Sequence, residues 1–364
     1  MKKLKIGMLT GGGDAPGLNA VIYAFVRAFY AKCPDGEIIG YKMGYRGLYH
    51  NDYVSLTPKT TSGILHRGGT ILHSSNKDNL FMYNVIENGE RVVKDVSDEA
   101  VENMKKEGLD VLVVLGGDGT LASAVSFAKK GIKVVGIPKT IDNDLGATDS
   151  TFGFDTAVNI VTENLGRLHT TAESHQRVIV AEVMGRYAGW IALHAGLAGS
   201  ADVILIPEMP YVLSKIVDKI NERAKEGKLF TIIVAGEGAK EAGGSQVVRE
   251  VIKDSPDPIR LGGVAAKIAA DLQPLIENEV RSVQLGHIQR GGETSPYDRV
   301  LSCRYAVKAV EMIEHGVFGH MVAKINGKML PVPLEDVIKS NKQVTPDNEL
   351  IKICQLMGIT FAEA

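Results

Sequence analysis

Short apolar runs recur along the chain, and most of them are followed by a glycine-bearing loop and then by a helical pattern. The runs are rich in valine, isoleucine and leucine, which favours buried strands. We expect strands at residues 4–9, 111–115, 132–137, 178–183, 203–206, 230–235 and 280–285. Helices are expected between them, at residues 18–31, 121–130, 187–198, 213–225, 262–272 and 298–315. This alternation predicts an α/β fold with a mostly parallel sheet in each of two lobes.

Composition excludes several classes of protein. A chain of 364 residues, of which 45% are hydrophobic, can bury a large core and suggests about two domains. The net charge of −2 provides no basic field for nucleic acid. Cys33, Cys303 and Cys354 are too few and too scattered for a disulfide framework or a metal site. No apolar run reaches the roughly 18 residues of a membrane span, so we expect a cytoplasmic protein without membrane or nucleic-acid partners.

One strand ends in a loop suited to phosphate. The sequence VLVVLGGDGT, at residues 111–120, places Gly116, Gly117, Asp118 and Gly119 after a buried strand and before a helix. Glycines permit close backbone approach, exposed N–H groups bind anions, and a carboxylate can hold a metal ion. Ligands of open parallel sheets bind at this end of the strands. A tight turn with a solvated aspartate is the structural alternative.

Two other loops carry similar signals. Residues 11–17, GGGDAPG, resemble a phosphate-cradling turn but lack the lysine and hydroxyl residue of a P-loop. Residues 138–144 gather Lys139, Thr140, Asp142 and Asp144 directly after a strand. Alternate residues of an extended segment point the same way, so Thr140, Asp142 and Asp144 can face one ligand. Crowded carboxylates raise each other's pKa, which suits a general base, although turn or capping chemistry would explain the loop equally well.

Cationic residues lie at both ends of two strands. Arg177 and Arg281 begin strands, whereas Arg186, His287 and Arg290 follow them. Guanidinium groups bind phosphate through two hydrogen bonds, so these residues predict a clamp for a sugar phosphate. A single arginine is more often part of a surface ion pair. The arrangement at both strand ends favours the clamp.

Six motifs in order resemble the 6-phosphofructokinases. They are GGGDAPGLNA, GGDGT, PKTIDND, HQRVIVAEVMGR, AGEG and LGHIQRGG, and they span about residues 5–305. Diacylglycerol and NAD kinases share the GGDGT loop but lack the TIDND, MGR and GHIQRGG motifs. The resemblance implies two Rossmann-like lobes, and the lack of a Pro/Ser-rich linker suggests that the chain crosses between them more than once. A nucleotide lobe would contain residues 1–140 and about 270–320, a fructose 6-phosphate lobe about 141–269, and about 321–364 would complete the fold.

The resemblance also implies a reaction, the committing step of glycolysis, in which ATP and fructose 6-phosphate give fructose 1,6-bisphosphate and ADP. Asp142 would be the base, Asp118 would hold Mg²⁺, and Thr140, Asp144 and Arg186 would position the reacting groups. The residues implied for ATP are Gly12, Gly13, Tyr45, Asn76, Lys77, Gly117, Asp118, Gly119 and Thr120. Those implied for the sugar phosphate are Thr140, Asp142, Arg177, Met184, Gly185, Arg186, Glu237, Arg281, His287 and Arg290. Arg177 and Arg281 would come from a neighbouring subunit, which implies a homodimer or homotetramer.

Two residues bear on the phosphoryl donor. In this family a glycine after GGD goes with ATP and an aspartate with pyrophosphate, so Gly119 favours ATP. Lys139 is the residue of the pyrophosphate users, which places the chain in the subgroup that contains both types. A pyrophosphate-dependent enzyme is therefore the first alternative. A non-catalytic, sugar-phosphate-binding regulatory subunit is the second, and the presence of Asp118 and Asp142 disfavours it.

Overall fold

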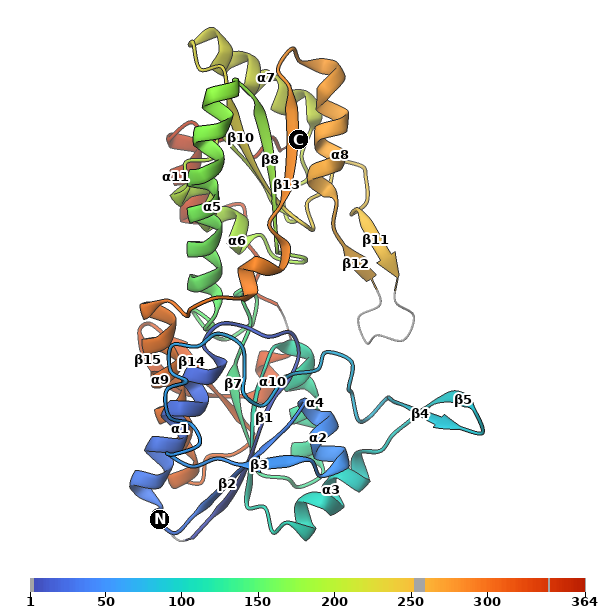
Figure 1. Ribbon diagram of the computed structural model, residues 1–364, viewed down its shortest axis with the longest axis vertical. Helices are drawn as coiled ribbons and strands as arrows, with labels where there is room; N and C mark the ends of the chain where they lie inside the picture. Colours follow the sequence, from blue (N-terminus) through green and yellow to red (C-terminus); the bar gives the residue numbers. More distant parts are fainter. Residues whose placement is uncertain (1–2, 252–258, 340, 364) are drawn as a thin grey trace.

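The chain folds into two lobes that lie one above the other along its long axis (Figure 1). The computed structural model describes residues 3–251, 259–339 and 341–363. Each lobe is a sheet covered by helices on both faces, and the predicted α/β fold with mostly parallel sheets is confirmed. No helix within the described ranges is long and apolar enough to cross a membrane.

The first lobe contains a mixed sheet whose central strands are parallel. Its order is β15-β14-β7-β6-β1-β2-β3, and only the β14–β15 and β2–β3 pairs are antiparallel. The bounds are β1 Lys5–Thr10, β2 Glu37–Tyr41, β3 Tyr53–Ser55, β6 Val111–Gly116, β7 Val134–Pro138, β14 His320–Ile325 and β15 Lys328–Pro333.

Helices cover both faces of this sheet. One face packs against α1 (Leu18–Lys32) and α9 (Pro296–Glu314). The other face packs against α2 (Tyr45–His50), α3 (Ser97–Lys106), α4 (Asp118–Lys129) and α10 (Leu334–Val337). Successive residues of a strand point to opposite faces, and so β6 is apolar throughout because both of its faces are buried. A hairpin of β4 (Tyr83–Glu87) and β5 (Glu90–Lys94) extends from the body (Figure 1).

The second lobe contains a smaller sheet that is entirely parallel, in the order β13-β8-β10-β9. Its strands are β8 Val178–Val183, β9 Val203–Leu205, β10 Thr231–Gly236 and β13 Val280–Gln284. One face packs against α5 (Phe154–His175), α6 (Trp190–Ala198) and α11 (Glu349–Leu356). The other packs against α7 (Leu213–Lys225) and α8 (Val264–Leu272), and β11 (Val248–Val251) pairs with β12 (Ile259–Leu261) separately.

The strands assigned to each lobe differ from the sequence-based division. β13 lies within the range expected for the nucleotide lobe, yet it pairs with β8 in the second sheet. The C-terminal range is also divided, because β14 and β15 extend the first sheet while α11 packs on α6. The chain therefore passes between the lobes three times, after β7, after β13 and after α10. A local pattern identifies a strand, but the partner of a parallel strand is set by distant residues.

Candidate active site

Glycines bring the loops after β1 and β6 into close contact. A Cβ atom added at Gly11 or Gly116 would lie 2.6 or 2.3 Å from the side chain of Thr120, so only glycine fits at these positions. Gly12 has a φ of 78° and donates its N–H to the carbonyl of Ser75 at 2.9 Å. Residues 11–13 and 116–120 thus form one packed floor with accessible backbone.

Helix α4 starts at Asp118, within this floor. Asp118 and Gly119 are exposed, and a Cβ at Gly119 would meet no atom within 4 Å. The first N–H groups of a helix and its macrodipole attract anions, so the loop suits a phosphate group. Within the described ranges, no group of three or more His, Cys, Asp or Glu side chains is arranged to hold a metal ion. Asp118 is thus the lone carboxylate that the GGDG loop offers to a metal.

Tyr45 lies behind the phosphate loop. Its side chain is only 4% exposed, its hydroxyl donates to the Thr120 carbonyl at 2.8 Å, and its ring stacks on Phe127. In the structure Tyr45 therefore supports the phosphate loop, and its contact with a nucleotide stays a prediction. Asn76 and Lys77 are exposed, close in sequence to the Ser75 carbonyl that binds Gly12.

The loop after β7 gathers its polar side chains through Thr140. The Thr140 hydroxyl accepts a hydrogen bond from the N–H of Asp142 at 3.0 Å and donates to Asp144 Oδ1 at 3.2 Å. Asn143 between them has a φ of 51°, a left-handed conformation that asparagine tolerates better than most residues. The loop is therefore a turn and not the extended segment assumed from the sequence, but the three side chains still gather as expected.

The carboxylates of the site are partly buried and act on one another electrostatically. Burial raises the pKa of Asp142, while the positive charges of Arg290 and Lys139 oppose this shift. Burial, assisted by the charge of Asp142, raises the pKa of Asp144 to about 7. Glu237, which follows β10, also has its pKa raised to about 7 by burial and then by Asp142. The residues from both lobes thus share one electrostatic environment.

Asp142 has an unused acceptor. Its Oδ1 atom is buried and has no hydrogen-bond partner in the part of the chain that the structure describes. A buried acceptor without a donor is unfavourable by about 1–3 kcal/mol. The position is therefore suited to a hydroxyl group supplied by a ligand.

Lys139 and Arg290 connect the carboxylate loop with residues 11–17. Lys139 is buried and its Nζ donates to the carbonyl of Gly13. Arg290 Nη1 donates to the carbonyl of Asp14 at 2.8 Å. Burial, followed by the nearby charge of Arg290, lowers the pKa of Lys139 to about 8. Two cations thus converge on the loop predicted to hold phosphates.

Loops of the second lobe complete the site. The N–H of Met184 donates to Gln289 Oε1 at 3.1 Å, and the carbonyl of Gly185 accepts from Gly238 at 3.1 Å. Gly185 has a φ of 134°, and a Cβ there would lie 2.8 Å from the carbonyl of Ala188. This glycine is required by the backbone conformation. The Met-Gly-Arg turn is therefore fixed by the loops after β10 and β13.

Arg186 and His287 are nearer to solvent. The Arg186 guanidinium lies over the ring of Tyr187, with 4.7 Å between Cζ and the ring centroid. His287 is exposed within the short 3₁₀ helix Gly286–Arg290. Arg186, Glu237, His287 and Arg290 all belong to loops after strands of the second sheet. Gln289, which sequence analysis missed, is fully buried and binds Met184, and its place between His287 and Arg290 in one motif was the available signal.

Arg177 and Arg281 lie elsewhere. Both form ion pairs with Glu279, at the starts of β8 and β13. Arg177 and Met184 flank the two ends of β8, a separation of roughly 20 Å at about 3.3 Å per residue. These arginines are therefore not brought to the same chain's cluster of Asp142, Glu237 and Arg290.

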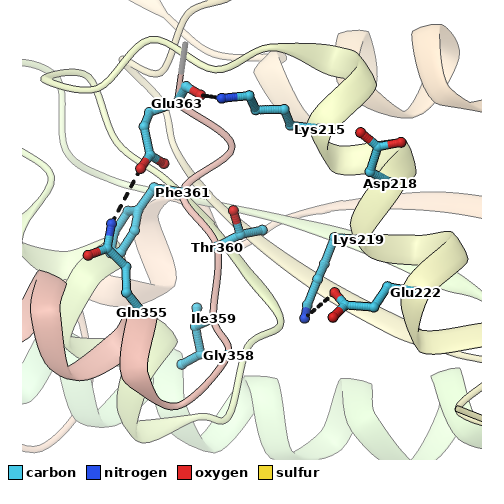
Figure 2. A pocket seen from close by; sticks show the side chains of 10 residues that line it. All are labelled: Lys215, Asp218, Lys219, Glu222, Gln355, Gly358, Ile359, Thr360, Phe361 and Glu363. Carbon is cyan, nitrogen blue, oxygen red and sulfur yellow. Dashed lines mark hydrogen bonds and ion pairs between the residues drawn. The ribbon is translucent and has the colours of Figure 1, made fainter.

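A cavity of about 550 Å³ lies between α7 and the C-terminal segment (Figure 2). It is lined by residues other than those of the loops described above. Lys215, Lys219 and Glu222 line one side of it, and residues 358–361 line the other. Lys215 donates to the carbonyl of Glu363, and Lys219 pairs with Glu222. None of the predicted site residues lines this cavity.

The sequence matches the phosphofructokinase family over residues 5–313. It is 62% identical over 361 residues to ATP-dependent 6-phosphofructokinase 2 of Clostridium perfringens, and the alignment covers 99% of this chain and 98% of that protein. It is 46% identical over 344 residues to the pyrophosphate–fructose 6-phosphate 1-phosphotransferase of Amycolatopsis methanolica, with 94% and 97% covered.

Solved structures with the same architecture include two phosphofructokinases. Phosphofructokinase of Pichia pastoris in the T-state has a TM-score of 0.78 and 29% identity, with 93% of this chain and 36% of that chain covered. The pyrophosphate-dependent phosphofructokinase of Marinobacter aquaeolei has a TM-score of 0.79 and 20% identity, with 99% and 92% covered. The second likeness concerns the fold alone.

Proposed function

The chain belongs to the phosphofructokinase family, and we propose that it is an ATP:D-fructose 6-phosphate 1-phosphotransferase that makes fructose 1,6-bisphosphate and ADP. The observation that carries this proposal is the buried, unpartnered Oδ1 of Asp142, which no other described residue satisfies. A sugar hydroxyl would satisfy it. The name of the Clostridium perfringens relative supports ATP as the donor.

In the proposed reaction Asp142 accepts the proton of the sugar 1-hydroxyl. The oxygen of that hydroxyl forms a bond to the γ-phosphorus, while the bond to the β–γ bridging oxygen breaks and ADP leaves. A raised pKa brings a carboxylate closer to the operating pH, which suits a general base. The positive charges of Arg290 and Lys139 favour the ionised form of this carboxylate. Thr140 and Asp144 hold the base in place through the hydroxyl of Thr140.

The phosphates of the nucleotide would lie on the floor formed by the two glycine loops. Gly12, Gly13, Gly117, Gly119 and Thr120 would line them, and Asn76 and Lys77 would approach from the exposed side. Asp118 would hold Mg²⁺, which when bound neutralises charge on the phosphates. Mg²⁺ usually takes only one or two carboxylates and fills its other positions with phosphate oxygens and water, so the single carboxylate of Asp118 suits it.

Fructose 6-phosphate would be held mainly by the second lobe. The proposed contacts are Thr140, Met184, Gly185, Arg186, Glu237, His287 and Arg290. Arg177 and Arg281 of a neighbouring subunit would bind the 6-phosphate, which requires a homodimer or homotetramer. Their position at the opposite end of β8 and β13 from this cluster supports the proposal that they serve another subunit's site.

Pyrophosphate is the second candidate donor. Lys139 favours it, because the family resemblance gives lysine at this position to the pyrophosphate users, as does the name of the Amycolatopsis methanolica relative. Gly119 favours ATP, because an aspartate there would lie in the space of the α-phosphate. A carboxylate some 4 Å from a phosphate charge would cost about 4 kcal/mol at an effective dielectric constant near 20, which is roughly a thousandfold in affinity.

A coupled assay tests the donor. Formation of fructose 1,6-bisphosphate is measured with ATP and with pyrophosphate at the same concentration, and we expect faster turnover with ATP. Gly119→Asp should reduce ATP use by roughly a thousandfold. Gly166→Asp is the control, because a Cβ at Gly166 also meets nothing within 4 Å. Faster turnover of the wild type with pyrophosphate would overturn ATP as the donor, and no turnover with either would favour the regulatory subunit.

A further inference from the structure

Lys342 contacts the carboxylate loop from the far end of the chain. Its Nζ donates to Asn143 Oδ1 at 3.1 Å, to the carbonyl of Thr148 at 3.0 Å and to that of Asp149 at 2.9 Å. An ammonium group has three N–H donors, so all of them are used by one loop. The backbone N–H of Lys342 donates to the carbonyl of Asp144 at 2.7 Å. Four hydrogen bonds thus join a single residue to residues 143–149.

One of these bonds acts on the residue between the two carboxylates. Asn143 is buried, has a left-handed backbone, and uses its side-chain oxygen to accept from both Lys342 and the N–H of Thr151. The direction of Asp142 and Asp144 depends on this conformation, because they flank Asn143 on either side. Loss of the ammonium would leave the amide oxygen of Asn143 with one donor, that of Thr151. The loop would then be held less rigidly in one conformation.

The same segment is joined to the second lobe. The indole Nε1 of Trp190, at the start of α6, donates to the carbonyl of Lys342 at 2.8 Å. Gln343 Nε2 donates to the carbonyl of Tyr187 at 3.3 Å, next to Arg186. The N–H of Val344 donates to Glu208 Oε1 at 2.9 Å, and Glu208 also accepts from Gly189. Residues 342–344 therefore lie between the loop of Asp142 and the loop of Arg186.

We propose that Lys342 is a positioning residue, which fixes the carboxylate loop against the Met-Gly-Arg turn so that Asp142 meets the sugar hydroxyl. The proposal rests on the role of Asp142 in the proposed function. Lys342 itself touches no reacting atom in this scheme. Residues 342–344 thus act on the active site, in addition to completing the fold.

The electrostatic setting of Lys342 supports this role. Burial lowers the pKa of Lys342 to about 8, and the charges of Asp149 and Asp144 oppose the shift. A partly buried ammonium is retained only where its donors are satisfied, and here three oxygens of one loop satisfy them. The arrangement predicts an effect on kcat more than on KM, because a misplaced base still allows both substrates to bind.

Three variants test the role. Lys342→Met removes the three donors and keeps the apolar stem, whereas Lys342→Arg keeps the charge and several donors. Lys215→Met is the matched control, because Lys215 also ties the body to the C-terminal segment through a carbonyl, that of Glu363 (Figure 2). Each purified protein is assayed for kcat and for both KM values, and hydrogen exchange of residues 142–151 and of α7 is followed without substrate.

We expect Lys342→Met to lower kcat by about a hundredfold, the loss that a misplacement near 1 Å can cause, with little change in KM. The amides of residues 142–151 should exchange faster in Lys342→Met than in the wild type. Lys342→Arg should recover part of the kcat and part of the slow exchange. Lys215→Met should change neither the kcat nor the exchange of these residues. The proposal would be overturned if Lys342→Met had the kcat and the hydrogen exchange of the wild type. It would also be overturned if exchange in Lys342→Met were faster throughout the protein and not only in residues 142–151. If the wild type itself lacks activity the proposed function fails, while the exchange data still decide whether Lys342 orders the loop.

Discussion

At the residue scale, the site concentrates carboxylates whose ionised form is destabilised by burial, so that their pKa values are raised. Asp142, Asp144 and Glu237 all have a pKa raised by burial, and the charge of Asp142 raises the other two further. Arg290 opposes the shift at Asp142 and at Glu237. Such an arrangement favours proton transfer at the expense of the stability of the free protein.

The stability of the free protein should therefore depend on pH through Glu237. The pKa of Glu237 is about 7 in the folded protein and 4.5 for an ordinary glutamate, as in the unfolded chain. The folded state therefore binds more protons than the unfolded state between these pH values. The free energy of unfolding then falls as pH rises from about 4.5 to about 7. The stabilisation by protonated Glu237 is fully present below about pH 4.5. Glu237→Gln should remove this fall, which urea unfolding of both proteins at a series of pH values would measure.

Glu335→Gln is the control for this experiment, because Glu335 is exposed and forms a surface ion pair with Lys129. The gain in stability of Glu237→Gln over the wild type should grow across this pH range, whereas that of the control should stay constant. Parallel curves for Glu237→Gln and the wild type would contradict the assigned pKa.

Sequence reasoning at this scale succeeded where the signal was local. Thr140, Asp142 and Asp144 occur within five residues after a strand, and the structure gathers them. It gave no sign that Tyr45 packs against Phe127, which lies in a helix far along the chain. Lys342 lies farther still from the loop that it binds. A contact between distant residues leaves no trace in the spacing of either one.

At the element scale, the C-terminal segment closes one edge of the second sheet. The N–H of Ile204 donates to the carbonyl of Thr360 at 2.9 Å, and the N–H of Thr360 donates to that of Asp202 at 3.2 Å. Further on, Val212 donates to the carbonyl of Ala362 at 2.7 Å. An unpaired edge invites association with other chains, so this segment protects β9.

Phe361 anchors that segment. Its side chain is 0% exposed and packs in the core that α5, α6 and α11 share. Phe361→Ala should lower the free energy of unfolding by about 3–5 kcal/mol, the usual result for a buried phenylalanine. Leu356→Ala, at a position 89% exposed, is the control and should change it by less than about 0.5 kcal/mol. Equal effects of the two substitutions in urea unfolding would contradict the packing described here.

Elements were predictable where their own residues carry the pattern. β8 and α7 have the bounds expected from the sequence, because one is an apolar run interrupted only by Glu182 and the other is strongly amphipathic. The long helix α5 was missed although Phe154, Ala157, Val161 and Leu165 recur at helical spacing and are buried. The pairing of β13 with β8 could not be predicted, because no local pattern encodes it.

At the scale of the whole molecule, the proposed site requires two subunits. Arg177 lies roughly 20 Å along β8, and Arg281 roughly 13 Å along β13, from the loops that would bind the sugar. Chains with Arg177→Ala and chains with Asp142→Asn should each be inactive. Mixed oligomers should regain activity, because one chain supplies Asp142 and its neighbour supplies Arg177.

The two variants are therefore co-expressed and assayed together. Random pairing in a symmetric dimer would restore about a quarter of the sites. Co-expression of Asp142→Asn with wild-type chains is the reference for total activity, because half of its sites should be active whether or not the subunits mix. Activity no greater than the sum of the separate variants would contradict a shared site.

The role of Asp142 is the central claim, and the rate of fructose 1,6-bisphosphate formation by Asp142→Asn tests it most directly. The amide keeps the size of the side chain but cannot accept a proton, so kcat with ATP should fall by about 10²–10⁴. Asp218→Asn, on the exposed side of α7, should keep the wild-type rate. A folded Asp142→Asn protein that retains the wild-type kcat would contradict the account.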